Sequence, residues 1–93
     1  MLWYLYILEC EDGSLYTGIT DNLKRRFDEH ASGKGGIYTG RNHPQKLLYH
    51  EIFENRFLAG RREKQIKGWS KAKKESLIAA DFVNLQKLSI SHD

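Results

Sequence analysis

The pattern of apolar and polar side chains along the chain predicts strands first and helices later. Residues 3–9 (WYLYILE) are rich in aromatic and branched apolar side chains, which predicts a strand covered on both faces. A turn signal at residues 11–13 (EDG) and a second short strand over residues 15–19 follow. These two strands should form an antiparallel hairpin. A third strand is expected over residues 46–52, in a direction that the pattern leaves open.

The first expected helix follows the hairpin. Thr20 or Asp21 can cap it, and it should run to about residue 32, where a glycine-rich loop leads to Pro44. One side of this helix carries apolar residues at i, i+4 and i+8, a spacing that predicts a core-facing stripe. The stripe consists of Leu23, Phe27 and Ala31.

Two further helices should fill the second half of the chain. Asn55 can cap a helix over residues 56–67, which Gly68 should end, and Ser70 can cap a shorter helix over residues 70–80. The last dozen residues indicate a short packed or frayed tail.

The order strand, strand, helix, strand, helix, helix predicts an α/β (α+β) domain, in which helices pack against a small sheet of three strands. Ninety-three residues suffice for one domain with a modest core. We expect that domain to span residues 1–80 and residues 81–93 to form a C-terminal tail.

The register of the hairpin decides how two tyrosines lie. A two-residue turn ending at Gly13 would pair Tyr6 with Ile19 and put Tyr6 and Tyr16 on opposite faces of the sheet. A three-residue turn, with Gly13 in the left-handed region, would pair Tyr6 with Gly18 and put both tyrosines on one face. Gly18 would then leave a hole beside the Tyr6 ring. The sequence leaves both registers open.

Charge adds a candidate partner to this picture. The formal net charge is +3, and residues 61–74 hold seven basic residues against one acid, while residues 24–26 form a second basic cluster. Such clusters favour an anionic partner such as nucleic acid, although a merely solvated lysine face has the same composition. Cys10 is the only cysteine and the N-terminal apolar run is too short for a bilayer, so we expect a cytoplasmic protein without a membrane segment.

Three polar side chains could take part in chemistry. Arg26 and His30 are four residues apart and therefore neighbours on one helix face, where they could bind a phosphate and move a proton. Glu63, within the longer basic run, could hold a divalent cation or simply pair with Lys67 at i+4. Taken singly, each of the three is better explained by an ordinary structural role.

Taken together, the residues resemble a known family. Five segments occur in the order of the GIY-YIG nuclease superfamily, in its small single-domain bacterial branch, and the resemblance covers about residues 2–78. The segments are residues 4–6 (YLY), 16–18 (YTG), 22–26 (NLKRR), 30–35 (HASGKG) and 59–69 (AGRREKQIKGW). The sequence departs from the pattern where Tyr4-Leu5 replaces Gly-Ile, where Thr17 replaces Ile, and where an Asn-Pro expected after the last helix is missing.

The resemblance implies a three-stranded antiparallel sheet flanked by helices and a metal-dependent endonuclease that hydrolyses DNA phosphodiester bonds, with DNA repair or recombination as its setting. Tyr6 and Tyr16 match the two motif tyrosines and Arg26 the helix arginine. Glu63 matches the single ligand of one Mg²⁺ or Mn²⁺ ion. His30 matches a position that varies between branches, with a role as helper of the base Tyr6.

The same resemblance assigns the surroundings of the site. Gly18 is expected to be structural, because it makes room for Tyr6. DNA contacts are expected from basic residues around the site, namely Lys24, Arg25, Lys34, Arg62 and Lys67. Since the sequence gives no further DNA-reading domain, a protein partner could supply targeting. The alternatives are a nucleic-acid-binding module of the same fold with little or no activity and, less favoured, a protein-interaction domain; the oligomeric state is open.

Overall fold

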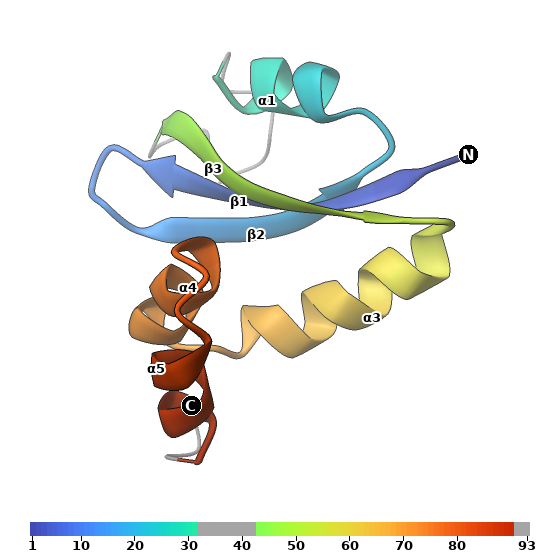
Figure 1. Ribbon diagram of the computed structural model, residues 1–93. Coiled ribbons are helices and arrows are strands. Elements are labelled where there is room, and N and C mark those ends of the chain that lie inside the picture. Colours follow the sequence, from blue (N-terminus) through green and yellow to red (C-terminus); the bar gives the residue numbers. More distant parts are fainter. Residues whose placement is uncertain (32–42, 91–93) are drawn as a thin grey trace.

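A three-stranded antiparallel sheet in the order β2-β1-β3 forms the centre of the computed structural model, which describes residues 1–31 and 43–90. The strands are β1 (Trp3–Cys10), β2 (Leu15–Thr20) and β3 (Pro44–Phe53). The helices are α1 (Leu23–Ala31), α3 (Arg56–Lys67), α4 (Lys71–Ile78) and α5 (Phe82–Ile90). Helix α1 lies on one face of the sheet, α3 and α4 lie on the other, and α5 packs against α4 (Figure 1).

This architecture confirms the predicted fold class and settles the direction of the third strand as antiparallel. The third strand starts at Pro44, two residues before the predicted start, and α4 ends at Ile78, two residues before the predicted end. The tail expected to be packed or frayed contains a helix, α5, which the sequence analysis did not predict and which packs against α4. Its signal was Asp81, a favoured capping residue whose Oδ1 accepts a hydrogen bond from the backbone N–H of Asn84 at 3.2 Å.

The hairpin adopts the three-residue turn. Gly13 has a φ of +83°, in the left-handed region, and the Cys10 N–H donates to the Ser14 carbonyl at 2.9 Å. Tyr6 therefore pairs with Gly18. The other register would have required a two-residue loop and would have turned every side chain of β2 to the opposite face.

The first helix has a different cap from the two predicted, one residue after Asp21 and two after Thr20. Asn22 is the cap: its Oδ1 accepts a hydrogen bond from the Arg25 N–H at 3.0 Å. Thr20 contributes by accepting from the Asn22 N–H at 3.1 Å, whereas Asp21 instead forms an ion pair with the Arg25 guanidinium. The predicted caps were therefore wrong, because three consecutive residues were all chemically able to cap.

The predicted apolar stripe of α1 is correct in two of its three positions. Leu23 and Phe27 are partly buried, but Ala31 is exposed. His30 is instead the fully buried residue of this helix. A polar ring in the interior at this point needs a polar partner, and that partner belongs to the candidate site described below.

The predicted caps of α3 and α4 are confirmed. Asn55 Oδ1 accepts from the Leu58 N–H at 3.0 Å, and Ser70 Oγ accepts from the Lys73 N–H at 3.1 Å. Gly68 ends α3, as predicted. Asn55 and Ser70, as the N-terminal caps, each satisfy one backbone N–H that the first turn of a helix leaves without a partner.

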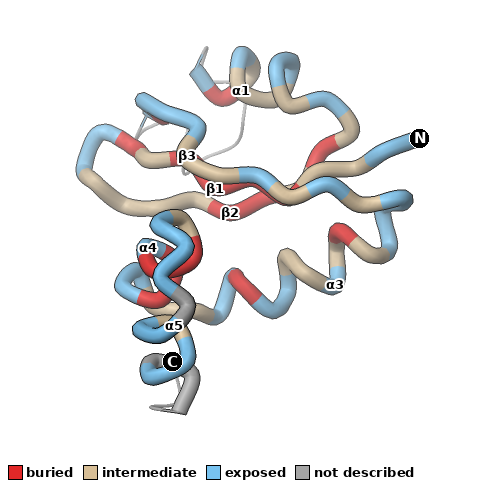
Figure 2. Tube along the Cα trace, viewed as in Figure 1, coloured by how far each residue is buried: buried red, intermediate tan, exposed pale blue. Residues whose placement is uncertain are grey.

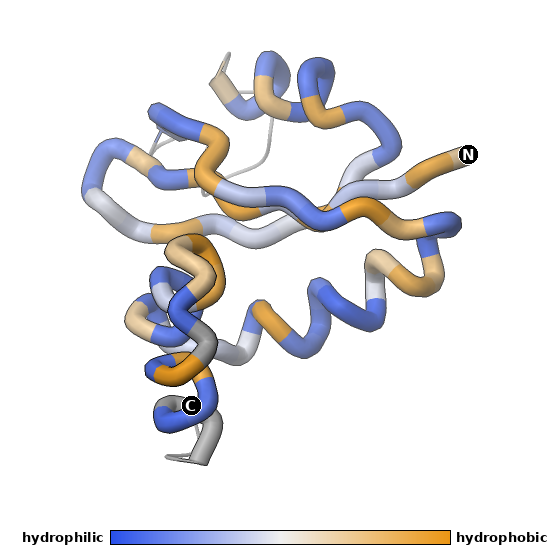
Figure 3. Tube along the Cα trace, viewed as in Figure 1, coloured by the Kyte–Doolittle hydropathy of each residue, from blue (hydrophilic) through white to orange (hydrophobic). Residues whose placement is uncertain are grey.

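The main hydrophobic core lies between the sheet and the pair α3 and α4. Leu5 and Ile7 of β1 pack there against Ile66 of α3 and Leu77 of α4. Within the sheet, burial is greatest along β1 and β2 (Figure 2). Helix α3 is hydrophilic over most of its length, with apolar residues at intervals (Figure 3). Within the described ranges, no helix has the length and apolar character that crossing a bilayer requires.

Thr17 lies in the layer that faces this core, at the position where the family pattern described above has isoleucine. Its hydroxyl is buried and has no hydrogen-bond partner among the described residues. Burying such a group without a partner destabilises a fold. Thr20, on the same strand, is equally buried but exchanges hydrogen bonds with the backbone of Asn22.

We expect Thr17→Val to raise the free energy of unfolding by about 1 kcal/mol, because valine keeps the shape and removes the unpaired hydroxyl. Urea denaturation of the two proteins measures this difference. Thr20→Val is the matched control and should lower the free energy of unfolding by a similar amount. Destabilisation by Thr17→Val would show that the hydroxyl has a favourable role.

Candidate active site

Aromatic and imidazole rings from three elements meet on the α1 face of the sheet. Tyr6 comes from β1, Tyr16 from β2 and His30 from α1. The Tyr6 hydroxyl lies 3.0 Å from His30 Nε2, in a buried hydrogen bond. The ring centroids of Tyr16 and His30 are 5.1 Å apart, and those of Tyr6 and Tyr16 are 6.3 Å apart. Of the two registers that the sequence left open, the structure therefore has the one that places both phenols on one face, beside His30.

Gly18 allows the Tyr6 ring to lie across β2. A Cβ atom added to Gly18 would stand only 2.6 Å from Tyr6 Cζ and still closer to the hydroxyl oxygen. The phenol hydroxyl is thus carried from the central strand β1 to the edge strand β2. At an edge, a side chain from the far face of the sheet can approach it.

Glu63 approaches from that far face, on α3. Its side chain is 22% exposed and forms an ion pair with Lys67 Nζ at 3.3 Å. The carboxylate is close enough to Tyr6 for its charge to raise the pKa of the phenol. Arg26 of α1 also acts on that phenol, with the opposite sign. The structure therefore places Glu63 and Arg26 within electrostatic reach of the same hydroxyl.

The protonation states of the buried pair follow from their surroundings. Burial raises the pKa of Tyr6 above that of a free phenol, and the Arg26 guanidinium offsets part of this rise. Burial, and then the positive charge of Arg26, lower the pKa of His30. At neutral pH, Tyr6 is therefore a neutral phenol and His30 a neutral imidazole, and the phenol can donate its proton to Nε2.

The cations that were predicted to contact DNA carry acidic partners. Each of the four that the structure describes forms an ion pair: Lys24 with Asp28, Arg25 with Asp21, Arg62 with Glu51, and Lys67 with Glu63. The Arg62 pair is partly buried and ties α3 to β3 through two hydrogen bonds of 2.9 and 3.1 Å. Lys34, the fifth, lies outside the described residues. Contact of these five with DNA stays a prediction.

The donor chemistry of the site limits how it could hold a metal. Among residues 1–31 and 43–90, no group of three or more His, Cys, Asp or Glu side chains is arranged to hold an ion. Glu63 is thus a single carboxylate. Such a donor suits Mg²⁺ or Mn²⁺ that takes its other ligands from substrate phosphate and water, and it does not suit a metal enclosed by protein.

A comparison with protein families identifies the family of this chain. The model of the GIY-YIG catalytic domain matches residues 2–76. The chain belongs to the GIY-YIG family. Its GIY-YIG relatives include a UPF0213 protein of Natronomonas pharaonis, 46% identical over 76 residues, or 82% of this chain and 89% of the relative. A UPF0213 protein of Clostridium perfringens is 47% identical over 80 residues, or 86% of each chain. Such relatives occur in bacteria and archaea, so the branch is wider than the bacterial one expected.

Two solved structures share the fold. The solution NMR structure of a UPF0213 protein from Bacillus halodurans is similar with a TM-score of 0.56 and 45% identity, covering 86% of this chain and 85% of that one. The solution NMR structure of a protein from E. faecalis gives a TM-score of 0.60 at 34% identity, covering 89% and 88%. None of these names states an activity.

Three basic residues were not among those predicted to contact DNA, although two of them, Arg61 and Lys64, belong to the basic run over residues 61–74. That prediction relied on clustering, whereas the structure separates cations with acidic partners from those without. Arg56, Arg61 and Lys64 belong to none of the ion pairs within the described parts of the chain. Helical spacing gave a usable signal, because Arg61 and Lys64 follow the exposed aromatic residue Phe57 by four and seven residues, on one face of the helix, and Arg56 directly precedes it.

Gly18→Ala is expected to lower the free energy of unfolding by about 1–3 kcal/mol and to displace the Tyr6 ring, because the added methyl group overlaps it. Urea denaturation measures the loss. Gly60→Ala is the control: a Cβ there meets nothing within 4 Å, and Gly60 lies in a helix, so the change should be neutral or stabilising by up to about 1 kcal/mol. Equal stability of the two variants would contradict the close contact.

The buried neutral state of His30 predicts a pH dependence of stability. Its folded pKa lies below the unfolded value of about 6.5, so the unfolded chain binds the proton first as pH falls. Its contribution is complete above the unfolded pKa and is lost as pH falls toward the folded pKa, at no more than about 1.4 kcal/mol per pH unit.

Urea denaturation between pH 7.5 and 5.5 measures this loss, taken as the difference between the wild type and His30→Gln. The stability advantage of the wild type should shrink as pH falls. His50→Gln, at an exposed histidine of β3, is the matched control and should run parallel to the wild type. Parallel curves for His30→Gln as well would contradict a buried neutral imidazole.

Proposed function

We propose that this GIY-YIG protein is a metal-dependent endonuclease that hydrolyses phosphodiester bonds of DNA. The observation that supports this most is the buried hydrogen bond between Tyr6 and His30 at the β2 edge, with Arg26 and Glu63 both within electrostatic reach. Phosphodiester hydrolysis needs an activated water, neutralisation of charge on the phosphate, and a bound cation. The Tyr6–His30 pair can accept the proton of the water, the Arg26 guanidinium can neutralise the phosphate, and the Glu63 carboxylate can bind the cation.

Arg26 is the residue suited to the phosphate itself. Its guanidinium is always charged and can donate two hydrogen bonds to non-bridging oxygens, where negative charge increases in the transition state. It is partly buried beside Tyr6, with Glu29 as a neighbour at 3.4 Å. Arg26 would hold the scissile phosphate next to the phenol.

Tyr6 and His30 would act together as the base. A water that attacks phosphorus must lose a proton as the P–O bond to the leaving alcohol breaks. The raised pKa of Tyr6 argues against a standing phenolate. The phenol would take the proton from water while passing its own to His30 Nε2, so that the imidazole carries the charge. Tyr16, in ring contact with His30, would position the water or the phosphate.

Glu63 would hold one Mg²⁺ or Mn²⁺ ion. Bound there, the ion would supply charge neutralisation for the phosphoryl oxygens and the leaving oxygen. The position of the carboxylate supports this role, because an acid beside a phosphate site repels the substrate unless a cation lies between them. That same argument disfavours the alternative of a binding module, which would need the basic residues alone.

The expected setting adds two further points to the proposal. DNA is the substrate we propose, with repair or recombination as the process, and a protein partner could direct the enzyme to its target. The number of subunits plays no part in this mechanism, because every proposed group comes from one chain.

Nicking of supercoiled plasmid tests the function. The wild type should nick in the presence of Mg²⁺ or Mn²⁺ and not in EDTA. Glu63→Gln should nick at least about 100-fold more slowly, because it removes the charged donor and changes the shape little. Glu75→Gln, at an exposed glutamate of α4, is the matched control and should nick like the wild type.

Two outcomes would contradict the proposal. A folded wild type that binds plasmid but never nicks it would favour the binding module. Equal nicking by Glu63→Gln and the wild type would remove Glu63 from the mechanism. A circular-dichroism melt of each variant separates loss of activity from loss of fold.

A further inference from the structure

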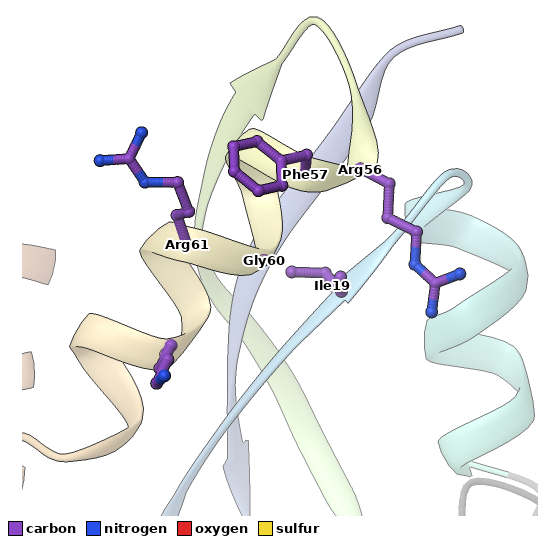
Figure 4. A pocket seen from close by; sticks show the side chains of 6 residues that line it. Ile19, Arg56, Phe57, Gly60 and Arg61 are labelled. Atoms are coloured by element: carbon purple, nitrogen blue, oxygen red, sulfur yellow. The ribbon is translucent and has the colours of Figure 1, made fainter.

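A groove runs between strand β2 and the first half of α3, with a volume of about 650 Å³. Its lining combines an apolar floor with cationic sides (Figure 4). The lining residues are Ile19, Arg56, Phe57, Gly60, Arg61 and Lys64. Arg56 and Arg61 extend to opposite sides of Phe57 and Ile19, so positive charge borders the groove on both sides.

Phe57 is unusual for its exposure. The side chain is 70% exposed, on the first turn of α3, in a domain whose other aromatic side chains for which burial is described are at least partly buried. Beside it, Gly60 carries no side chain, and even an added Cβ would meet nothing within 4 Å. The Phe57 ring therefore borders the open space of the groove.

The cations of the groove differ from the other basic residues near the site. In the described parts of the chain, Arg56, Arg61 and Lys64 form no ion pair with a carboxylate. Arg56 lies 5.3 Å from the Trp3 ring centroid and Arg61 lies 5.9 Å from that of Phe57. Their charge is therefore available to an anionic ligand without first breaking a salt bridge.

The groove adjoins the candidate active site. Gly60 and Lys64 flank Glu63 on the same helix, at three residues before it and one after it. Ile19 comes from β2, next to Gly18, over which the Tyr6 hydroxyl lies. A DNA strand whose phosphate sits between Arg26 and Glu63 would have its neighbouring nucleotide at this groove.

We propose that the groove binds one unpaired nucleobase of the substrate strand, stacked on Phe57, with the flanking phosphates held by Arg56, Arg61 and Lys64. An exposed aromatic ring among cations suits base stacking combined with backbone attraction. This inference rests on the proposed function and refines its substrate to DNA with a base outside the duplex next to the cleaved bond.

An intact duplex would use only part of this surface. Its bases are stacked on one another, so it would offer phosphates to the three cations and nothing to the Phe57 ring. A protein partner that used the ring would have to supply acidic groups on both sides of an apolar residue. The unpaired base engages the ring, the open space and the charges at once.

Fluorescence of 2-aminopurine tests this stacking directly. A single-stranded oligonucleotide of about ten nucleotides with one 2-aminopurine is titrated with the protein in EDTA, so that no cleavage occurs. Wild-type protein should change the fluorescence on binding, as a base that moves onto an aromatic ring does. Phe57→Leu should bind this strand about tenfold more weakly and lose the fluorescence change.

Two comparisons make the result specific. Phe57→Leu should bind a blunt duplex as well as the wild type does, because phosphate contacts remain. Val83→Ala, at a residue of α5 that is 69% exposed, should match the wild type for both DNAs. Unchanged binding and fluorescence in Phe57→Leu would overturn the stacking site. An equal loss of affinity for the duplex and for the single strand in Phe57→Leu would also overturn it.

Plasmid nicking distinguishes this failure from failure of the proposed function. A wild type that nicks DNA but shows no response at Phe57 loses the stacking site alone. A wild type that shows the Phe57 response but does not nick retains the stacking site and loses the nuclease mechanism. Phe57→Leu remains informative because the side chain is on the surface and its loss should leave the melting temperature unchanged.

Discussion

The close approach of the Tyr6 ring to the backbone of Gly18 is the constraint on which the candidate site depends. The ring crosses β2 only because residue 18 has no side chain, and the hydroxyl thereby reaches the edge of the sheet. There it meets His30 from α1 and comes within the electrostatic reach of Glu63 from α3. With any other residue on β2 at this point, groups from opposite faces of the sheet would stay separated by it.

Charge is distributed around this site in two different ways. Some basic residues form ion pairs that hold elements of the fold together. The clearest is Arg62, whose two hydrogen bonds to Glu51 join α3 to β3. The cations beside Phe57 have no such pairs in the described ranges. The net charge of +3 is small, but three cations that form no ion pair in the described ranges border this one groove.

Local chemistry explains which features could be predicted from the sequence. Asn55, Ser70 and Gly68 act on backbone groups a few residues away, so the ends of α3 and the start of α4 were found correctly. At the start of α1, three adjacent capping residues made the same reasoning ambiguous. The hairpin register stayed open because both turns were compatible with Gly13, and only the packing of the sheet distinguishes them.

Prediction of the site from the sequence was limited in the same way, because contacts between distant residues are not visible in local patterns. A resemblance of ordered motifs assigned Tyr6, His30 and Glu63, but spacing within the sequence carried no information on how they approach one another. The ion pairs of the basic residues were also out of reach where the partner is distant, as with Arg62 and Glu51, which are 11 residues apart. The raised pKa of Tyr6 arises from burial, a property of the folded chain alone, and it favours the proposed pairing with His30 over a standing phenolate.

Ile66 lies one helical turn after Glu63 and is fully buried against Leu5 and Ile7. The thickness of this apolar layer therefore sets how far α3 stands from the sheet, and with it the gap between the Glu63 carboxylate and the Tyr6 hydroxyl. A methylene group more or less at Ile66 would alter the spacing of groups it never touches. Packing in this core and geometry of the site are consequently coupled, although Leu5, Ile7 and Ile66 have no polar atom to contribute.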